Sequence, residues 1–382
     1  MKRTRVLALF LALMLLTVLP GCGKTAENVP ASGLGNGTEP VSHMELQYAR
    51  QFSVDEYADG CRLITVQDDG RYLVVPEGVT APKGISSDIV VLQRPLQNVY
   101  LAATAVMSLI DSLGVLDGIG LSGTQADKWY NDNAREAMEE GRIRFAGKYS
   151  EPDYEMILSA GCPLAIESTM IYHKPEVREK LESLGVPVFV ERSGRETSPL
   201  GRTEWIKVYG VLFDKEEEAQ QLFDQQAAMM EEAEKDEPTG KTVAFFYISS
   251  SGSAVVRKSG DYVAKMIQLA GGTYIFSDLG EEDSSASTTA MDMETFYQKA
   301  KDADVVIYNA TIAGELDSVA TLVARNPLLA EFKAVKEGNV WCSDQNIYQE
   351  TMQLGSMVLE LHCLLTTDDP AGTQLHYFYH LK

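Results

Sequence analysis

Cationic and aromatic side chains follow several predicted strands of this sequence, at the positions where loops begin. Guanidinium and ammonium groups bind carboxylates and anionic chelates, and aromatic rings pack against flat ligands. The alternative for each residue is a solvated charge or a ring packed in the core. Loops at the carboxyl ends of parallel strands line the crevice of an open α/β sheet. The candidate ligand-binding residues are therefore Trp129, Tyr130, Arg192, Arg195, Tyr247, Arg257, Lys258, Tyr262, Asn309 and Tyr348.

Sequence patterns that carry catalysis do not occur in the chain. There is no Gly-x-Ser-x-Gly elbow, no Gly-x-x-x-x-Gly-Lys-Ser/Thr loop and no His-Glu-x-x-His. The run from Ser249 to Ser253 follows a strand and could cradle a phosphate, but it lacks the P-loop lysine, so a polar cleft loop is the simpler interpretation. We expect a binding protein and no enzyme.

Histidine and cysteine are too scattered to predict a metal site or a bound cofactor. His43 is near the N-terminus and His173 stands alone, while the other three histidines lie in the C-terminal segment without acids or cysteines at ligand spacing. No Cys-x-x-Cys occurs. Free, buried thiols are favoured over a disulfide for the four cysteines of the body, which are Cys61, Cys162, Cys342 and Cys363.

The N-terminus has the features of a secretory signal. Lys2, Arg3 and Arg5 precede an apolar run at 6–19, which is too short to span a bilayer. The run ends in Leu19-Pro20-Gly21-Cys22, which resembles the lipobox of bacterial lipoproteins. We therefore predict a signal peptide at 1–21 and a lipid-modified Cys22; the alternative is an ordinary signal peptide with a chance cysteine.

The segment after Cys22 and the overall charge indicate where the protein works. Residues 22–43 are rich in Gly, Ser, Thr, Asn and Pro, which predicts a flexible tether before a body that starts at Met44. Lipid chains on one cysteine would hold the protein at the outer face of the cytoplasmic membrane. The net charge of −22 disfavours nucleic-acid binding, which needs a basic surface.

The elements that must position the candidate residues follow a strand and helix pattern. Two β-rich runs, 63–66 and 72–75, flank Gln67-Asp68-Asp69-Gly70 and predict an extra β-hairpin at 60–76. Further strands are predicted at 88–92, 98–101, 118–121, 163–166 and 186–191, with helices at 102–113, 153–160 and 174–184. This alternation is typical of a mostly parallel, doubly wound sheet, so residues 44–213 are predicted to form an N-terminal α/β lobe.

A long charged stretch separates this lobe from a second one. A helix is predicted at 201–213, and the composition of 214–237 favours a longer helix that joins the lobes, although a solvated surface helix is the alternative. A second βα series follows within 238–382, with strands at 242–248 and 304–308 and helices at 261–270 and 293–301. The predicted fold class is α/β, with two Rossmann-like lobes of mostly parallel sheets, one interlobe helix and a ligand cleft between the lobes.

Six segments in a fixed order carry a resemblance to a known family. They are 107–119 (MSLIDSLGVLDGI), 151–155 (EPDYE), 163–166 (PLAI), 267–272 (IQLAGG), 303–307 (ADVVI) and 334–340 (AVKEGNV). From about Asp88 onwards the chain resembles the solute-binding proteins that carry ferric siderophores, haem and cobalamin to ABC importers. The resemblance implies a rigid interlobe helix, limited lobe closure, a monomer and no chemistry on the ligand. The β segment at 47–82 departs from the family, and no basic triad of catecholate-siderophore type is found.

The resemblance also implies two docking residues. In the family, one glutamate on the outward face of each lobe pairs with arginines of the permease, and Glu155 and Glu294 occupy the matching positions. A carboxylate near a helix start remains free to accept a bidentate arginine contact. The alternative is an acid that only stabilises its helix.

These expectations define one function and two alternatives. The protein is expected to capture an iron chelate, haem or a corrinoid and to deliver it to an ABC permease. A lipoprotein that senses a ligand with the same fold is the first alternative. A tetrapyrrole metal chelatase is the second, although such an enzyme usually needs a His and acidic pair in its cleft.

Overall fold

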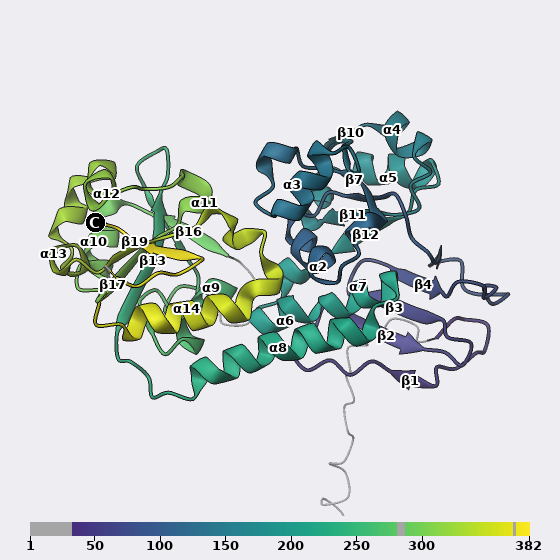
Figure 1. The fold of residues 1–382 in the computed structure, drawn as a ribbon, viewed down its shortest axis with the longest axis horizontal. Coiled ribbons are helices and arrows are strands. Elements are labelled where there is room, and N and C mark those ends of the chain that lie inside the picture. Colours follow the sequence, from purple (N-terminus) through teal and green to yellow (C-terminus); the bar gives the residue numbers. More distant parts are fainter. Residues whose placement is uncertain (1–32, 281–286, 370–371) are drawn as a thin grey trace, which may run out of the picture.

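The computed structural model describes residues 33–280, 287–369 and 372–382. The predicted signal peptide and Cys22 lie outside the described residues. Two α/β lobes stand side by side above a pair of long helices, and a separate β-sheet lies beside the first lobe (Figure 1). Of the helices within the described residues, none combines the length and apolar character needed to cross a bilayer.

The first lobe is built on a five-stranded parallel sheet. Its order is β12 (Val188–Glu191), β11 (Ala165–Ser168), β6 (Val99–Leu101), β7 (Ile119–Ser122) and β8 (Arg144–Phe145). The helices of this lobe are α2 (Met107–Ser112), α3 (Asp132–Glu139), α4 (Tyr154–Ser159) and α5 (Pro175–Ser183). A short antiparallel pair, β9 (Gly147–Lys148) and β10 (Glu151–Pro152), precedes α4. Because the strands are buried and parallel, their carboxyl ends meet at one edge, where the loops face the second lobe.

The extra β segment is a sheet of its own. Its strands run in order from β1 (Ser42–His43) through β2 (Phe52–Glu56), β3 (Arg62–Val66) and β4 (Arg71–Val75) to β5 (Ile89–Gln93). The β3–β4 hairpin is antiparallel, whereas β5 pairs parallel with β4. The strand predicted at 88–92 therefore belongs to this sheet and not to the doubly wound sheet.

The prediction of a flexible tether up to His43 is wrong for residues 33–43. Leu34 is fully buried in a small core with Tyr57 and Leu73, and β1 pairs with β2. Leu34 and the two residues of β1 hold this polar segment against the sheet. So few contact residues produce no periodic pattern in the sequence, which is why the pattern did not predict them.

Two buried glutamates join the extra sheet to the first lobe. The carboxylate of Glu204 accepts the backbone N–H groups of residues 47–49 at 2.8 to 3.0 Å. Glu196 accepts the N–H groups of residues 50 and 51 and the indole Nε1–H of Trp205. Lys207 Nζ lies 2.9 Å from Glu204 Oε1 and neutralises its buried charge. A five-residue loop is thus held by side-chain acceptors in place of a strand partner.

Long helices run under both lobes. The helix predicted at 201–213 is divided into α6 (Pro199–Glu204) and α7 (Ile206–Phe213), and α8 (Glu216–Glu234) is the interlobe helix. The C-terminal helix α14 (Leu354–Thr366) packs along α8 (Figure 1). Gly355 allows this close approach, because a Cβ atom there would lie 2.6 Å from the carbonyl oxygen of Gln226. Helix α8 therefore connects the lobes as part of a packed pair.

The second lobe has a mixed sheet. Its order is β16 (Thr288–Met291), β14 (Ala254–Arg257), β13 (Thr242–Ile248), β17 (Val305–Tyr308), β18 (Val340–Ser343) and β19 (Phe378–His380), with β15 (Thr273–Tyr274) also paired to β13. Strands β13, β15, β17 and β18 are parallel, whereas β14, β16 and β19 are antiparallel to their neighbours. The helices are α9 (Tyr262–Leu269), α10 (Met293–Ala300), α11 (Ala310–Ala313), α12 (Val319–Arg325) and α13 (Lys333–Glu337).

The four cysteines of the body are free thiols. Cys61, Cys162 and Cys342 are buried, as the sequence predicts. Cys363 is exposed, so the prediction of burial is wrong for this residue. It lies on α14, whose buried side is formed by its apolar residues.

Glu167 is a buried acid without a partner. Its side chain on β11 is 0% exposed, and neither carboxylate oxygen has a hydrogen-bond donor among the described residues. Burial raises its pKa to about 8. Between the unfolded pKa, near 4.5, and the folded pKa, the unfolded chain has lost this proton and the folded chain has kept it, so the stability falls as pH rises.

We predict that Glu167→Gln removes this penalty. The variant should exceed the wild type in free energy of unfolding by on the order of 2 to 4 kcal/mol at pH 8, and the difference should shrink towards pH 5. Urea unfolding at the two pH values measures it. Glu179→Gln, at an exposed residue of α5, is the control. Equal pH slopes for wild type and Glu167→Gln would contradict the prediction.

Candidate functional site

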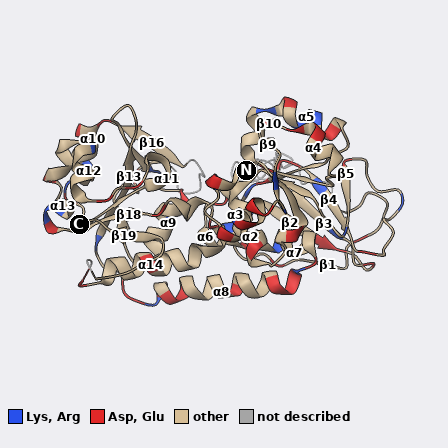
Figure 2. Cartoon of the chain, turned by 45° about the horizontal axis from the view of Figure 1, so that its top comes forward, with Lys and Arg blue, Asp and Glu red and all other residues tan. Residues whose placement is uncertain are grey.

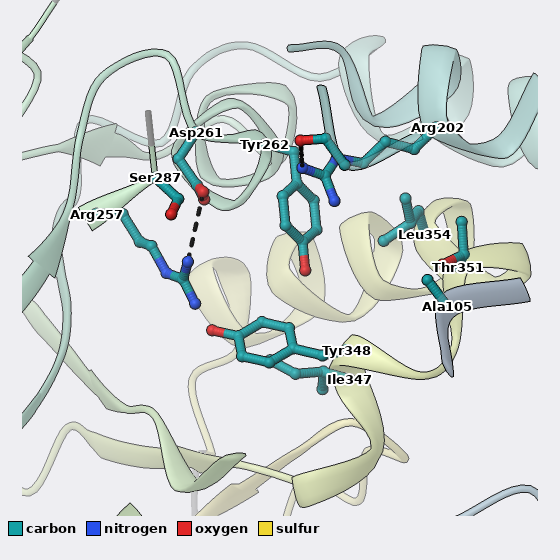
Figure 3. Close-up of a pocket in the computed structure, with 11 residues that line it drawn as sticks. Ala105, Arg202, Arg257, Asp261, Tyr262, Ser287, Ile347, Tyr348, Thr351 and Leu354 are labelled. Carbon is teal, nitrogen blue, oxygen red and sulfur yellow. Dashed lines mark hydrogen bonds and ion pairs between the residues drawn. The ribbon is translucent and has the colours of Figure 1, made fainter. Parts of the chain in front are cut away.

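A cavity of about 230 Å³ lies where both lobes meet the long helices. The first lobe contributes Ala105 and Gly194, from the loops after β6 and β12, and α6 contributes Arg202. The second lobe contributes Arg257, Asp261 and Tyr262. The turn η7 (Gln345–Tyr348) and the start of α14 complete the wall (Figure 3).

Arg257 enters the cavity from the end of β14. The residue is only 8% exposed, and its guanidinium Nη1 lies 3.4 Å from Asp261 Oδ2. Asp261 caps α9, because its Oδ1 accepts the N–H of Val263 at 2.9 Å. The guanidinium carbon lies 4.9 Å from the ring centroid of Tyr348. The cap and the ring hold the cation in one orientation.

Arg202 approaches from the opposite wall. Its guanidinium carbon lies 3.8 Å from the ring centroid of Tyr262, close enough for a cation–π contact. Its Nη2 and Nε donate to the carbonyl oxygens of Gly194 and Glu196 at 3.1 and 3.3 Å. Among the described residues, no carboxylate lies within ion-pair distance of this guanidinium.

The two tyrosines order the cationic wall. Burial raises the pKa of Tyr262, and the charges of Arg202 and Arg257 act against that rise, which places both cations near its hydroxyl. Figure 3 shows the Tyr262 ring between the two guanidinium groups. Tyr348 is positioned by Asn309, whose Nδ2 donates to the phenol oxygen at 2.9 Å. The arrangement can bind an anion and can exclude a cation.

The structure brings part of the predicted set together. Arg257, Tyr262 and Tyr348 line the cavity, and Asn309 supports it from behind. Sequence reasoning missed Arg202 and Asp261. Arg202 lies inside a helix and Asp261 is a helix cap, and neither position carries a local signal for ligand binding.

Other members of the predicted set lie elsewhere. The prediction is wrong for Trp129, which is 2% exposed and packs in the core, with its Nε1 donating to Ser122 Oγ at 3.2 Å. Arg192 lies 3.8 Å from Asp68 in the β3–β4 turn. Arg195 is exposed and Lys258 is half-buried, and neither lines the cavity.

Tyr130 and Tyr247 have different surroundings. The Tyr130 N–H donates to Gln349 Oε1 at 3.0 Å, its hydroxyl bonds Gln345, and Gln349 Nε2 donates to Lys128 O at 2.9 Å. The loop after β7 is thereby tied to the segment that carries Tyr348. Tyr247 lines a separate hollow of about 650 Å³ on the second lobe, beside the serine-rich loop at 249–253.

The predicted docking glutamates occupy equivalent places on the two lobes. Glu155 is in the first turn of α4 and Glu294 is in the first turn of α10. Both are exposed, and neither forms an ion pair with a described residue. Figure 2 shows α4 and α10 on the side of the lobes opposite the acidic helix α8. Both carboxylates are free to accept arginine from a partner.

The chain is similar to known solute-binding proteins. Residues 103–346 match the family model described as "Periplasmic binding protein". An uncharacterised lipoprotein of Methanocaldococcus jannaschii is 26% identical, over 96% of this chain and 94% of that protein. The periplasmic haem-binding protein HutB of Vibrio cholerae superposes with a TM-score of 0.57 at 18% identity, covering 69% of this chain and 97% of that chain.

A further structure extends the comparison. A protein of the ABC-type Fe3+-hydroxamate transport system from Saccharomonospora viridis superposes with a TM-score of 0.53 at 18% identity, covering 70% of this chain and 93% of that chain. At this identity the two solved structures show a shared fold. The family match itself covers more than half of the chain, including most of both lobes. The chain therefore belongs to the periplasmic binding protein family.

Proposed function

We propose that this protein is the ligand-capturing component of an ABC importer and that it carries an iron chelate, haem or a corrinoid. The observation that supports this most directly is the cavity between the lobes, where Arg202, Arg257, Tyr262 and Tyr348 converge from separate elements. Family membership supports the capture role, and the haem-binding and hydroxamate-transport structures with the same fold support the ligand class.

We further propose that Cys22 carries lipid and holds the body at the outer face of the cytoplasmic membrane. The sequence around Cys22 and the name of the archaeal relative, a lipoprotein, support this location. Glu155 and Glu294 then meet the permease. In this arrangement the protein loads ligand outside the cell and unloads it at the membrane without changing its chemistry.

A melting-temperature screen tests the binding role. The purified protein is heated with ferric siderophores, haem and cobalamins, and its absorbance as isolated is recorded to detect a ligand that co-purifies. A ligand at 100 times its dissociation constant stabilises the folded state by about 2.7 kcal/mol, which shifts the transition measurably. We expect one chemical class to produce this shift. If no class of compound shifts the melting temperature, the proposed ligand class is contradicted.

A further inference from the structure

We infer that the interlobe cavity is a carboxylate-binding subsite, so that the transported ligand carries a free carboxylate that seats between Arg202 and Arg257. This inference rests on the proposed function and narrows its ligand. It concerns one part of the ligand, the anionic arm, and the body of the ligand lies outside the cavity.

The charged side chains that line the cavity leave an excess of positive charge. Two guanidinium groups face one carboxylate, that of Asp261, among the described residues that line it. Asp261 is 2% exposed and Arg257 is 8% exposed, so solvent screens this site weakly. Asp261 balances only one of the two guanidinium charges, and an incoming carboxylate would pair with the other, that of the half-buried Arg202. The whole chain has a net charge of −22 and repels anions at long range, so the excess of positive charge is local to this cavity.

The orientation of the guanidinium groups fits a carboxylate. Each guanidinium carbon lies over a tyrosine ring, at 3.8 Å from the centroid for Arg202 and 4.9 Å for Arg257. The rings hold the two groups in place and leave N–H donors for a ligand. Each guanidinium has five N–H donors. Among the described residues, Arg202 donates two of its N–H groups to backbone carbonyl oxygens. Arg257 makes one contact, of 3.4 Å, to Asp261. The remaining donors match the paired oxygens of a carboxylate.

The size of the cavity limits what enters it. Its volume of about 230 Å³ is below the roughly 300–1,000 Å³ of pockets that enclose drug-sized ligands. A carboxylate and its linking carbons fit in this space, whereas a whole macrocycle or chelate does not. A chelate without a free carboxylate would desolvate Arg202 and leave it without an acidic partner, so the site should bind such a chelate more weakly.

Matched ligand pairs test the inference on the full chain in detergent. Isothermal titration compares haem with haem dimethyl ester, and ferric citrate with ferrioxamine B, together with cyanocobalamin. In at least one pair, we expect the compound with free carboxylates to bind at least about 30-fold more tightly than the compound without them. This comparison uses only the wild-type protein and does not depend on any variant folding.

Variants then locate the carboxylate. Arg202→Gln and Arg257→Gln, on separate elements, should each weaken binding of the preferred carboxylate ligand by about 30- to 100-fold and leave the weak binding of its partner unchanged. Arg325→Gln removes the same charge from the second lobe outside the cavity and should bind as the wild type does. Melting curves identify any variant that is unfolded.

The results distinguish failure of the carboxylate subsite from failure of the proposed capture role. Tight binding of ferrioxamine B, cyanocobalamin or the haem diester, unaffected by either arginine variant, would overturn the carboxylate subsite and leave the capture role intact. Binding of a carboxylate ligand with full affinity by both arginine variants would also overturn it. Binding of no ligand in the panel would overturn the inference and the proposed ligand class together.

Discussion

Uptake should be abolished when Glu155 and Glu294 are both replaced by arginine, while the affinity of the isolated protein for its ligand stays unchanged. Both carboxylates are exposed at helix starts on the side of the lobes opposite α8, and the interlobe cavity is elsewhere. Arginine at these positions would repel arginines of the permease, because like charges brought together at an interface cost several kcal/mol. Uptake of radiolabelled ligand by cells and titration of the purified protein measure the two properties separately.

The control keeps the same change in net charge. Glu179→Arg with Glu337→Arg alters one exposed glutamate on each lobe, at positions away from the starts of α4 and α10. Cells with this pair should take up ligand normally. Normal uptake by cells with the Glu155 and Glu294 pair would show that these glutamates do not dock the protein.

Glu204→Gln should lower the free energy of unfolding by about 3 to 5 kcal/mol at pH 7, because it leaves Lys207 buried without its charge partner. The substitution also replaces one oxygen acceptor by an NH₂ group facing the backbone N–H groups of residues 47–49. The loop between β1 and β2 would lose part of its attachment to α6. Urea unfolding of the wild type and the variant at pH 7 measures the difference.

The same interaction predicts a pH dependence. Burial acts to raise the pKa of Glu204, but the backbone N–H groups and Lys207 outweigh it, and the folded pKa lies below its usual value. A lowered folded pKa means that the contribution to stability is present above about pH 4.5 and is lost as pH falls through the folded pKa. The difference in free energy of unfolding between the wild type and Glu204→Gln should therefore become smaller in acid. Glu231→Gln, at an exposed position of α8, should change the free energy of unfolding neither at pH 7 nor in acid. A difference that persists in acid would contradict the role of this charge.

The sequence predicted the two lobes because long periodic segments dominate them. The alternation of apolar strands with amphipathic helices, and the charged stretch that forms α8, are strong signals. The antiparallel strands β14 and β16 carried no such signal. Each is four residues long. Strand β14 pairs with β13 as a hairpin, and β16 pairs with β14, from which it is distant in the sequence, so the tertiary fold fixes β16 in the sheet.

The site was only partly predictable for the same reason. A position just after a predicted strand indicates that a residue is near the crevice. It does not show whether the side chain points into the crevice or into the core. Trp129 turns into the core, where Ser122 satisfies its N–H, and Tyr348 turns into the cavity, where Asn309 orients it. Arg202 was missed because its partners, Tyr262 and Gly194, come from separate elements that only the fold brings together. Tertiary contacts decide such cases.

Accumulation of ligand in cells with and without this protein shows whether the protein supports transport. The ligand is the compound that stabilises the purified protein, supplied in radiolabelled form below the concentration at which other routes contribute. Loss of the protein should abolish high-affinity accumulation, the wild-type chain should restore it, and the ligand should enter chemically unchanged. Undiminished accumulation without the protein, although it binds that compound tightly, would contradict a transport role and would point to sensing.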